Sequence, residues 1–318
     1  MSGKNVTDVV LADRVGIAQT ARILAEGGIV AVPTETVYGL AARADSERAV
    51  ARIYAAKGRP DFNPLIVHVS GVKQAQLYAE MPQAAKDLAA REWPGPLTMV
   101  LPLLKSAALA PAVTAGLPTV ALRAPRHPVM RALLDAVDFP LAAPSANRSG
   151  FISPTCASHV LTSLDGRIDL VLDGGATEAG VESTIAALRA DGSWEELRPG
   201  PIDLAANPAR GPAKIEAPGQ LASHYAPGKP VRLNAREVAP GDFFIGFGTV
   251  EGDCNLSPKG DLQDAAARLY DCLHKGAASA KPRIAVAPIP QEGVGRAIND
   301  RLRRAATPPG SGPESAPD

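Results

Sequence analysis

The chain has 318 residues, with 33 Lys plus Arg against 33 Asp plus Glu, so its formal net charge is zero. This balance weighs against a protein whose main task is to grip a nucleic-acid backbone, because such proteins are usually basic over at least one domain. Hydrophobic residues at 46% and charged residues at 21% indicate a folded chain rather than a disordered one, with enough length for two domains.

The first two hundred residues alternate short apolar runs with helical patterns. Strand candidates rich in β-branched residues are GIVAV (28–32), PLIVHV (64–69), TVALRA (119–124) and IDLVLD (168–173). Apolar residues at helical spacing mark SERAVARIYAAK (46–57) and HPVMRALLDAV (127–137). The alternation predicts an α/β domain with a mixed sheet, to which we assign residues 1–206.

Residues 207–230 have a different composition, with five prolines and three glycines in 24 residues. Such a segment suits neither a helix nor a central strand, so it predicts a domain boundary. At its centre stand His224 and Tyr225. A linker that needs only reach and solubility favours Gly, Ser, Pro and charge, so this aromatic pair suggests a further role.

Alternation resumes after the linker on a smaller scale. VRLNA, DFFIGFG and RIAVAPI are strand candidates, and helices are expected over 261–276 and 295–306. Asp261 is the expected N-cap of the first helix and Gly276 its stop. We predict a small βαβα unit with a parallel sheet over residues 231–306, followed by a disordered tail at 307–318.

The cysteines Cys156, Cys254 and Cys272 are far apart and odd in number, without a C-x-x-C pair. This spacing argues against both a disulfide framework and a zinc site, and it fits a reducing cytoplasm. The first residues lack the apolar core of a signal peptide, and no later apolar run is long enough to span a membrane. We therefore expect a cytoplasmic protein without a membrane partner.

The densest chemical candidate is KGRPDFNPLIVH, residues 57–68. Pro60 disfavours helix at Arg59, so Lys57 and Arg59 are expected on an exposed, extended turn. An ammonium beside a guanidinium suits a polyphosphate. The alternative is that both cations only complement the C-terminal end of the preceding helix. His68, in the strand that follows, is either a catalyst or a satisfied core histidine.

A second candidate is APSANRSG, residues 143–150, where Ser145 and Asn147 point to the same side of an extended stretch. A hydroxyl and an amide there suit a ribose, a phosphate or a polar substrate, although a plain turn uses the same residues. Similar small polar clusters follow other strand candidates, at PTETVYG (33–39), VESTI (181–185) and LRPGP (197–201). The chain has no phosphate-loop, metal-helix or nucleophile-elbow motif.

Seven motifs in order resemble the YrdC-like domain of the threonylcarbamoyl-AMP synthase family: PTETVYGL, KGRPDFNPLIVH, WPGPLT, TVALR, APSAN, GVESTI and LRPGP. SHYAP, followed by a small α/β domain, resembles the two-domain branch of that family. The resemblance implies an open, twisted mixed-sheet domain with a positively lined cavity, joined by a Pro/Gly-rich linker to a smaller Rossmann-like α/β domain.

The resemblance also implies an activity. Members of the family are nucleotidyltransferases that condense L-threonine, bicarbonate and ATP into threonylcarbamoyl-AMP and release pyrophosphate. Mg²⁺ is expected to travel with ATP rather than to occupy a site made by the protein. A tRNA threonylcarbamoyl-transferase complex then uses the product to modify the adenosine beside the anticodon, and weak direct binding of tRNA is a further expectation.

Carried over motif by motif, the resemblance assigns site residues. Lys57 and Arg59 are the expected catalytic cations, and His224 with Tyr225 the expected lid. The residues expected to contact ATP are Lys57, Arg59, Asn63, Thr119, Ser145, Asn147, Ser153, Arg198 and Tyr225. Those expected to hold threonine are Thr36, His68, Arg123, Ala143 and Ser183.

Two other functions stay open at this point. The basic patches RAPRH (123–127) and RLRR (301–304) are compatible with a module that binds double-stranded RNA or tRNA, or assists ribosome assembly, without catalysis. A carbamoyltransferase that forms carbamoyl-adenylate with a related domain is the other alternative. Enzymes of that second kind carry zinc-binding cysteine pairs, which this sequence lacks.

Overall fold

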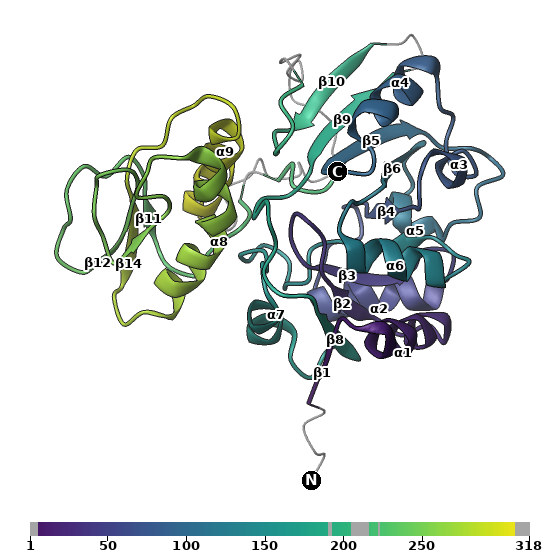
Figure 1. The fold of residues 1–318 in the computed structure, drawn as a ribbon, viewed down its shortest axis with the longest axis horizontal. Coiled ribbons are helices and arrows are strands. Elements are labelled where there is room, and N and C mark those ends of the chain that lie inside the picture. Colours follow the sequence, from purple (N-terminus) through teal and green to yellow (C-terminus); the bar gives the residue numbers. More distant parts are fainter. Residues whose placement is uncertain (1–5, 190–192, 205–215, 222, 309–318) are drawn as a thin grey trace, which may run out of the picture.

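The computed structural model describes residues 6–189, 193–204, 216–221 and 223–308. Figure 1 shows two α/β domains side by side, the larger built from the first two hundred residues and the smaller from the last eighty. A segment that we call the strap, residues 216–221 and 223–230, connects them. The first part of the predicted linker, 207–215, and most of the predicted tail, 309–318, lie outside the described residues.

The large domain contains a mixed sheet of ten strands among the described residues, in the order β1-β8-β2-β3-β7-β4-β6-β5-β9-β10. Its strands are β1 (Asp8–Leu11), β2 (Val30–Val32), β3 (Gly39–Arg43), β4 (Ile66–His68), β5 (Leu97–Pro102), β6 (Thr119–Arg123), β7 (Leu141–Ala142), β8 (Leu170–Asp173), β9 (Thr184–Leu188) and β10 (Trp194–Arg198). Its helices are α1 (Arg14–Ala25), α2 (Glu47–Lys57), α3 (Val72–Ala75), α4 (Gln83–Glu92), α5 (Pro111–Thr114), α6 (Pro128–Ala136) and α7 (Ala157–Leu164). The predicted mixed sheet is confirmed.

Helices cover both faces of this sheet because side chains alternate along each strand. In β2, Val30 and Val32 pack in a buried cluster with α6, whereas Ala31 packs in the cluster that contains α2 residues on the opposite face. Helix α2 begins after Ser46, whose hydroxyl accepts from the Ala49 amide, and ends at Gly58 with φ 58°. The left-handed glycine turns the chain sharply into the Lys57–Arg59 segment.

The small domain is a four-stranded sheet in the order β11-β14-β12-β13, with every described pairing parallel, as predicted. Its elements are β11 (Val231–Arg232), β12 (Asp242–Gly246), β13 (Cys254–Asn255), α8 (Leu262–Ala278), β14 (Arg283–Val286) and α9 (Gly295–Ala306). Helices α8 and α9 lie on the side of this sheet that faces the large domain (Figure 1).

The expected ends of α8 are half correct. Asp261 is the N-cap and accepts from the amides of Gln263 and Asp264. Gly276 is not the stop, because the helix continues to Ala278. A Cβ atom at Gly276 would lie 2.8 Å from Ile284 Cδ1. Glycine there permits close packing of the helix on the sheet, and it does not end the helix.

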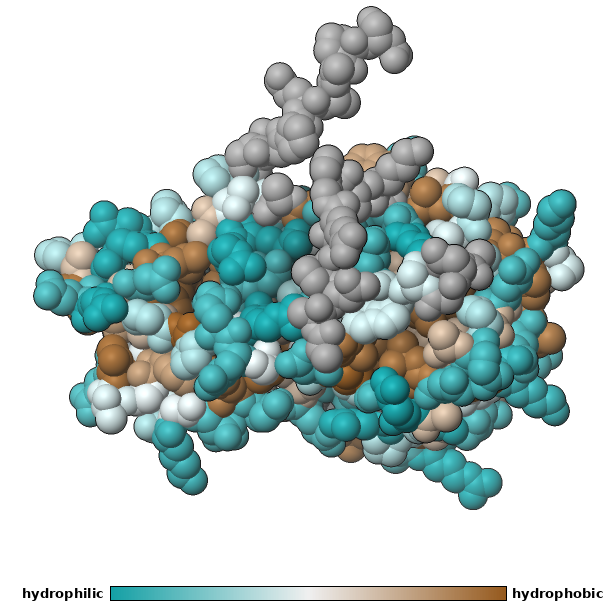
Figure 2. Space-filling view, turned by 90° about the horizontal axis from the view of Figure 1, so that it is seen from above, coloured by the Kyte–Doolittle hydropathy of each residue, from teal (hydrophilic) through white to brown (hydrophobic). Residues whose placement is uncertain are grey.

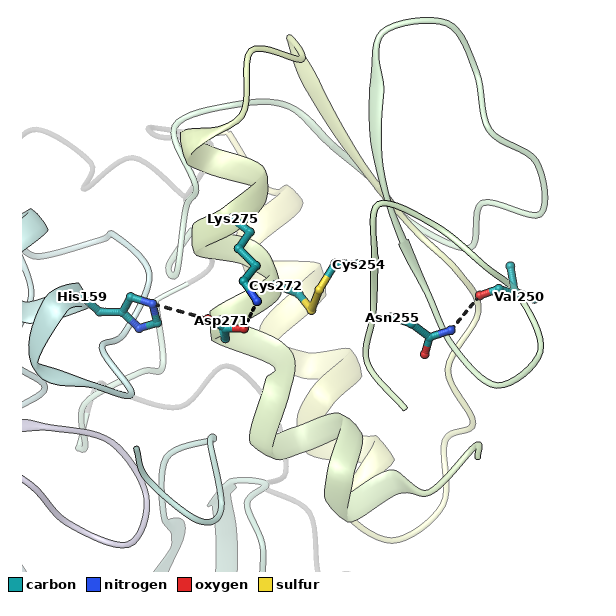
Figure 3. The surroundings of a disulfide bond; sticks show 7 residues. All are labelled: His159, Val250, Cys254, Asn255, Asp271, Cys272 and Lys275. Atoms are coloured by element: carbon teal, nitrogen blue, oxygen red, sulfur yellow. Dashed lines mark hydrogen bonds and ion pairs between the residues drawn. A yellow bond between two sulfur atoms is a disulfide. The ribbon is translucent and has the colours of Figure 1, made fainter. Parts of the chain in front are cut away.

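The expectation that the cysteines form no disulfide is wrong, since Cys254 and Cys272 are bonded with their Cα atoms 6.0 Å apart. Figure 3 shows Cys272 on α8 reaching across to Cys254 at the strand β13. The spacing argument considered only neighbours in sequence. It missed a pair separated by 18 residues because packing of α8 against the sheet brings the two together.

None of the described helices is long and apolar enough to cross a membrane. On the face seen in Figure 2, hydrophilic and hydrophobic residues are interspersed. The largest cluster of buried hydrophobic residues belongs to the large domain, and a second joins α8, α9 and the small sheet. That second cluster also includes Val37, Ile152 and Val181 of the large domain. The two domains are therefore packed against each other through an apolar contact.

Candidate active site

A cavity of about 50 Å³ lies where the ends of several strands of the large sheet meet the strap. Its lining comes from loops and strand ends that are far apart in the sequence. The lining residues are Thr34, Thr36, Val37, Gly39, Arg59, Ile66, His68, Arg123, Ala143, Pro144, Ser145, Glu182, Ser183, Arg198, Pro218, Gly219, His224 and Tyr225.

One wall of the cavity is organised by Arg123, the last residue of β6. Its guanidinium donates from Nη2 to Glu35 Oε1 at 2.6 Å, from Nη1 to Thr36 Oγ1 at 2.9 Å and from Nε to the Gly95 carbonyl at 3.3 Å. Burial alone would raise the pKa of Glu35, but Arg123 outweighs it and the pKa lies below its ordinary value. The buried carboxylate thus fixes the guanidinium, which keeps further N–H donors for a ligand.

His68, the last residue of β4, is a second group on this wall. Burial lowers its pKa to about 3, so the imidazole is neutral at physiological pH. Its Nδ1 atom is buried without a hydrogen-bond partner among the described residues. A buried polar atom of this kind usually binds a water molecule or a ligand, which argues against a fully satisfied core histidine.

The expectation that Lys57 and Arg59 are exposed is wrong, since the two residues are 2% and 9% exposed. Lys57 Nζ donates to the carbonyls of Ser145, at 2.5 Å, and Asn147, at 2.6 Å. Arg59 donates to the carbonyls of Asn63 and Pro64. The turn at Gly58 folds Lys57 beneath the Ser145–Asn147 loop and Arg59 against the main chain at Asn63 and Pro64. Burial, with Arg59 nearby, lowers the pKa of Lys57, and burial lowers that of Arg59 to about 10.

A third buried cation, Arg198 at the end of β10, contacts the strap. It donates from Nη2 to Ser183 Oγ at 3.1 Å and from Nη1 to the Pro218 carbonyl at 3.2 Å. Gly219 adopts φ 82° and packs against Arg198 and Tyr225. A Cβ atom at this position would lie 3.0 Å from Arg198 Nη1 and 3.1 Å from Tyr225 Oη. Glycine is therefore required where the strap passes over the cavity.

His224 and Tyr225 hold the strap against the cavity. Tyr225 is completely buried, adopts φ 62° and meets the His224 ring edge-on at 4.1 Å between centroids. Neither Tyr225 Oη nor His224 Nδ1 has a hydrogen-bond partner within the described part of the chain. Burial lowers the pKa of His224 to about 3 and raises that of Tyr225.

The structure brings most of the predicted site residues to one place. Those that line the cavity are Thr36, Arg59, His68, Arg123, Ala143, Ser145, Ser183, Arg198, His224 and Tyr225. Lys57, Asn63, Asn147 and Ser153 lie directly behind this lining, linked through Ser145, Arg59 or Glu182. Buried side-chain atoms of Asn63 and Asn147 lack partners among the described residues.

Thr119 is the exception. It stands at the start of β6, whereas the cavity is reached at Arg123, at the other end of that strand. Four residues of extended chain separate the two Cα atoms by roughly 13 Å. The structure therefore does not place Thr119 at the cavity.

Sequence reasoning also missed two carboxylates. Glu35 holds Arg123, and Glu182 lines the cavity beside Ser183. Both stand inside motifs that were recognised, PTETVYGL and GVESTI. Each is a charged residue within a small polar cluster that follows an apolar strand, and this pattern could have indicated that it belongs to the site.

Comparisons with known proteins agree over both domains. A family model described as "Telomere recombination", which covers the Sua5, YciO and YrdC proteins, matches residues 22–200. A second, described as "Threonylcarbamoyl-AMP synthase, C-terminal domain", matches residues 193–307. The threonylcarbamoyl-AMP synthase of Bacillus subtilis is 42% identical over 334 aligned residues, which cover 95% of this chain and 96% of its own. The chain belongs to the two-domain threonylcarbamoyl-AMP synthase family.

A solved structure aligns with this chain across both domains, and another aligns with part of it. Pyrococcus abyssi Sua5, crystallised with L-threonine, is 34% identical with a TM-score of 0.85, and the likeness covers 95% of this chain and 97% of that one. Escherichia coli YciO, at 21% identity and a TM-score of 0.54, covers 63% of this chain and shares the fold. The family match across both domains identifies the chain as a nucleotidyltransferase and favours the synthase over the carbamoyltransferase alternative.

Proposed function

We propose that the cavity is where this synthase binds its substrates, with L-threonine against Arg123 and ATP toward Lys57, Arg59 and Arg198. One observation carries the proposal. Within the described part of the chain, these last three buried cations form no ion pair, and most of their hydrogen bonds go to carbonyl oxygens. Buried cations without a carboxylate partner favour an anionic ligand such as a triphosphate.

Threonine binding is supported by the chemistry around Arg123. A guanidinium already fixed by Glu35 matches a substrate carboxylate, and the hydroxyls of Thr36 and Ser183 are suited to the substrate hydroxyl. His68 and the main chain at Ala143 complete this side of the cavity. The Pyrococcus abyssi relative, whose crystal structure contains L-threonine, supports this assignment.

ATP is assigned to the opposite side, between the buried cations and the strap. The partnerless side-chain atoms of Asn63 and Asn147, with the hydroxyls of Ser145 and Ser153, are suited to its ribose and phosphates. The strap lies across this side, since Pro218, Gly219 and Tyr225 line the cavity and Tyr225 is completely buried. The strap must therefore move before ATP enters, which makes His224 and Tyr225 a lid over the bound nucleotide.

The reaction needs no protein nucleophile. The amine of threonine adds to carbon dioxide derived from bicarbonate, and an oxygen of the resulting carbamate attacks the α-phosphorus of ATP. The bond from that phosphorus to the oxygen bridging the α- and β-phosphates breaks, and pyrophosphate leaves with the electron pair. Lys57 and Arg59 act by holding the phosphates and stabilising the charge that develops on them. Exclusion of water by the closed strap protects the acyl-adenylate.

Mg²⁺ is expected to arrive with ATP. Glu182, which lines the cavity, is paired with Arg301, and Glu35 is paired with Arg123 behind the lining. The described residues contain no cluster of three or more His, Cys, Asp or Glu that could hold a metal. Oxygens of the triphosphate would bind the ion, which neutralises part of their charge.

The product is a reactive mixed anhydride, so a second enzyme must accept it promptly. We assign that step to a tRNA threonylcarbamoyl-transferase complex acting in the cytoplasm, where ATP and tRNA are present. Weak direct binding of tRNA stays a prediction; of the basic residues predicted for it, Arg126 is exposed but paired with Glu178, and Arg301 is buried.

A pyrophosphate-release assay tests the proposal, with threonine and bicarbonate omitted in turn. We expect release only when ATP, threonine and bicarbonate are all present. Release that is independent of threonine would refute the assignment. Binding of tRNA that weakens steeply with salt, without any pyrophosphate release, would instead favour a binding module.

A further inference from the structure

The small domain reaches the active site through a buried carboxylate of the large domain. Glu182 Oε2 accepts from Arg301 Nε at 2.9 Å and from Tyr270 Oη at 2.8 Å. Its Oε1 accepts from Ser153 Oγ at 2.5 Å. Arg301 stands on α9 and Tyr270 on α8, whereas Glu182 lines the cavity. One side chain from each helix of the small domain thus bonds to the same cavity residue.

Arg301 also holds main chain of the large domain. Its Nη1 donates to the Pro199 carbonyl at 2.7 Å, and its Nη2 lies 3.4 Å from the Glu182 carbonyl. These carbonyls adjoin Ser183 and Arg198, one from each of the segments GVESTI and LRPGP. The Arg301 side chain is 0% exposed, so its guanidinium is fixed on every side.

We propose that Arg301 is a positioning residue of the active site, supplied by the C-terminal domain. It fixes the Glu182 carboxylate, which accepts from Ser153, and its bonds to the Glu182 and Pro199 carbonyls hold the main chain beside the Ser183–Arg198 pair. This inference rests on the proposed roles of Ser153, Ser183 and Arg198 in substrate binding. It gives the C-terminal domain a task beyond carrying the strap, because the catalytic domain is incomplete without that guanidinium.

The charges around Glu182 supply a measurable consequence. Burial alone would raise its pKa, but Arg301 first and Arg198 next lower it to about 2. Tyr270, Tyr225 and His224 are other titratable groups that face it. Arg301 itself is shared with a second carboxylate, since its Nη1 lies 3.0 Å from Asp300 Oδ2. Without Arg301 the largest effect that opposes burial is lost, so the folded-state pKa of Glu182 rises. When Glu182 is protonated, its carboxyl is neutral, and its hydrogen bonds from Ser153 and Tyr270 become weaker.

The experiment compares two arginines of the same helix. Arg296 also crosses between the domains, to Glu196 at 2.5 Å, but neither of these two residues lines the cavity. We expect Arg301→Met to lower kcat/KM for threonine and for ATP about tenfold or more. Its activity relative to wild type should rise with increasing pH as Glu182 ionises, because loss of Arg301 raises the pKa of that carboxyl. Arg296→Met should leave both quantities at wild-type values.

Two further variants keep the inference testable if Arg301→Met does not fold. Arg301→Lys retains the charge next to Glu182 but cannot reach both carbonyls, so it should restore the flat pH dependence and only part of kcat/KM. Tyr270→Phe removes one donor without changing charge and should lower kcat/KM several-fold. Variants at 301 and 270 that behave like Arg296→Met would overturn the inference. Absence of threonine-dependent release in the wild-type enzyme would instead refute the proposed function.

Discussion

Replacing Arg123 by Lys tests the threonine side of the cavity. Arg123 donates three hydrogen bonds within the protein, to the side chains of Glu35 and Thr36 and to the Gly95 carbonyl. Glu35 and Thr36 are both buried. Lysine offers one nitrogen on a flexible chain, so it cannot hold Glu35 and grip a substrate carboxylate bidentately. Loss of one hydrogen bond to a charged group, about 2 kcal/mol, raises KM for threonine about thirtyfold.

The measurement is steady-state pyrophosphate release, with threonine varied at saturating ATP and then the reverse. The KM for ATP should change little, because the nucleotide is assigned to the other side of the cavity. Arg126→Lys is the matched control, since Arg126 is half exposed and pairs only with the surface residue Glu178. An unchanged KM for threonine in Arg123→Lys, or an equal rise in both KM values, would refute the reasoning.

Four further expectations concern the lid, specificity, the disulfide and acid stability. Alanine at both His224 and Tyr225 should impair synthesis or release hydrolysed product while near-UV circular dichroism stays native; unchanged turnover and yield would make the strap a plain linker. Serine should be a poor but detectable substrate, since it lacks only a methyl group worth about 1–3 kcal/mol; equal rates at equal concentration would contradict this. Serine at both Cys254 and Cys272 should lower the free energy of unfolding by about 3 kcal/mol in denaturant titrations, as the bond closes a short loop; identical midpoints would contradict the entropic argument. The folded pKa of Glu182, about 2, is below its ordinary value of 4.5. Its ionic contacts therefore stabilise the protein above about pH 4.5 and are lost as the pH falls toward 2; Glu182→Gln should flatten that slope in acid titrations.

Local signals predicted the elements well. Helical spacing of apolar residues over 46–57 located α2, and the alternation of apolar runs located β2, β4, β6 and β8. The parallel sheet of the small domain followed from the same alternation. The prediction that α8 ends at Gly276 was wrong, because a glycine that permits close packing cannot be distinguished, in sequence, from one that ends a helix.

The sequence predicted which residues form the site, but not how deeply they are buried or what they contact. Motif order identified Arg123, Ser183 and Arg198, yet no pattern in the sequence shows that Lys57 is 2% exposed. Its burial depends on the Ser145–Asn147 loop, almost ninety residues away, folding over it. The Cys254–Cys272 bond is likewise a product of tertiary packing. Contacts of this kind arise from topology rather than from local preference.

The order of the cavity residues along the chain has a consequence for biosynthesis. Thr36 is made early, the strap only near residue 220, and the helix that carries Arg301 almost last. Domains generally fold as units during synthesis, with the N-terminal one first, and long-range contacts form late. A nascent chain with a folded first domain therefore presents its cavity before the strap covers it and before Arg301 reaches Glu182. Nucleotide present during translation can occupy that open cleft, so the last contacts made by the new protein are those that close over its substrate.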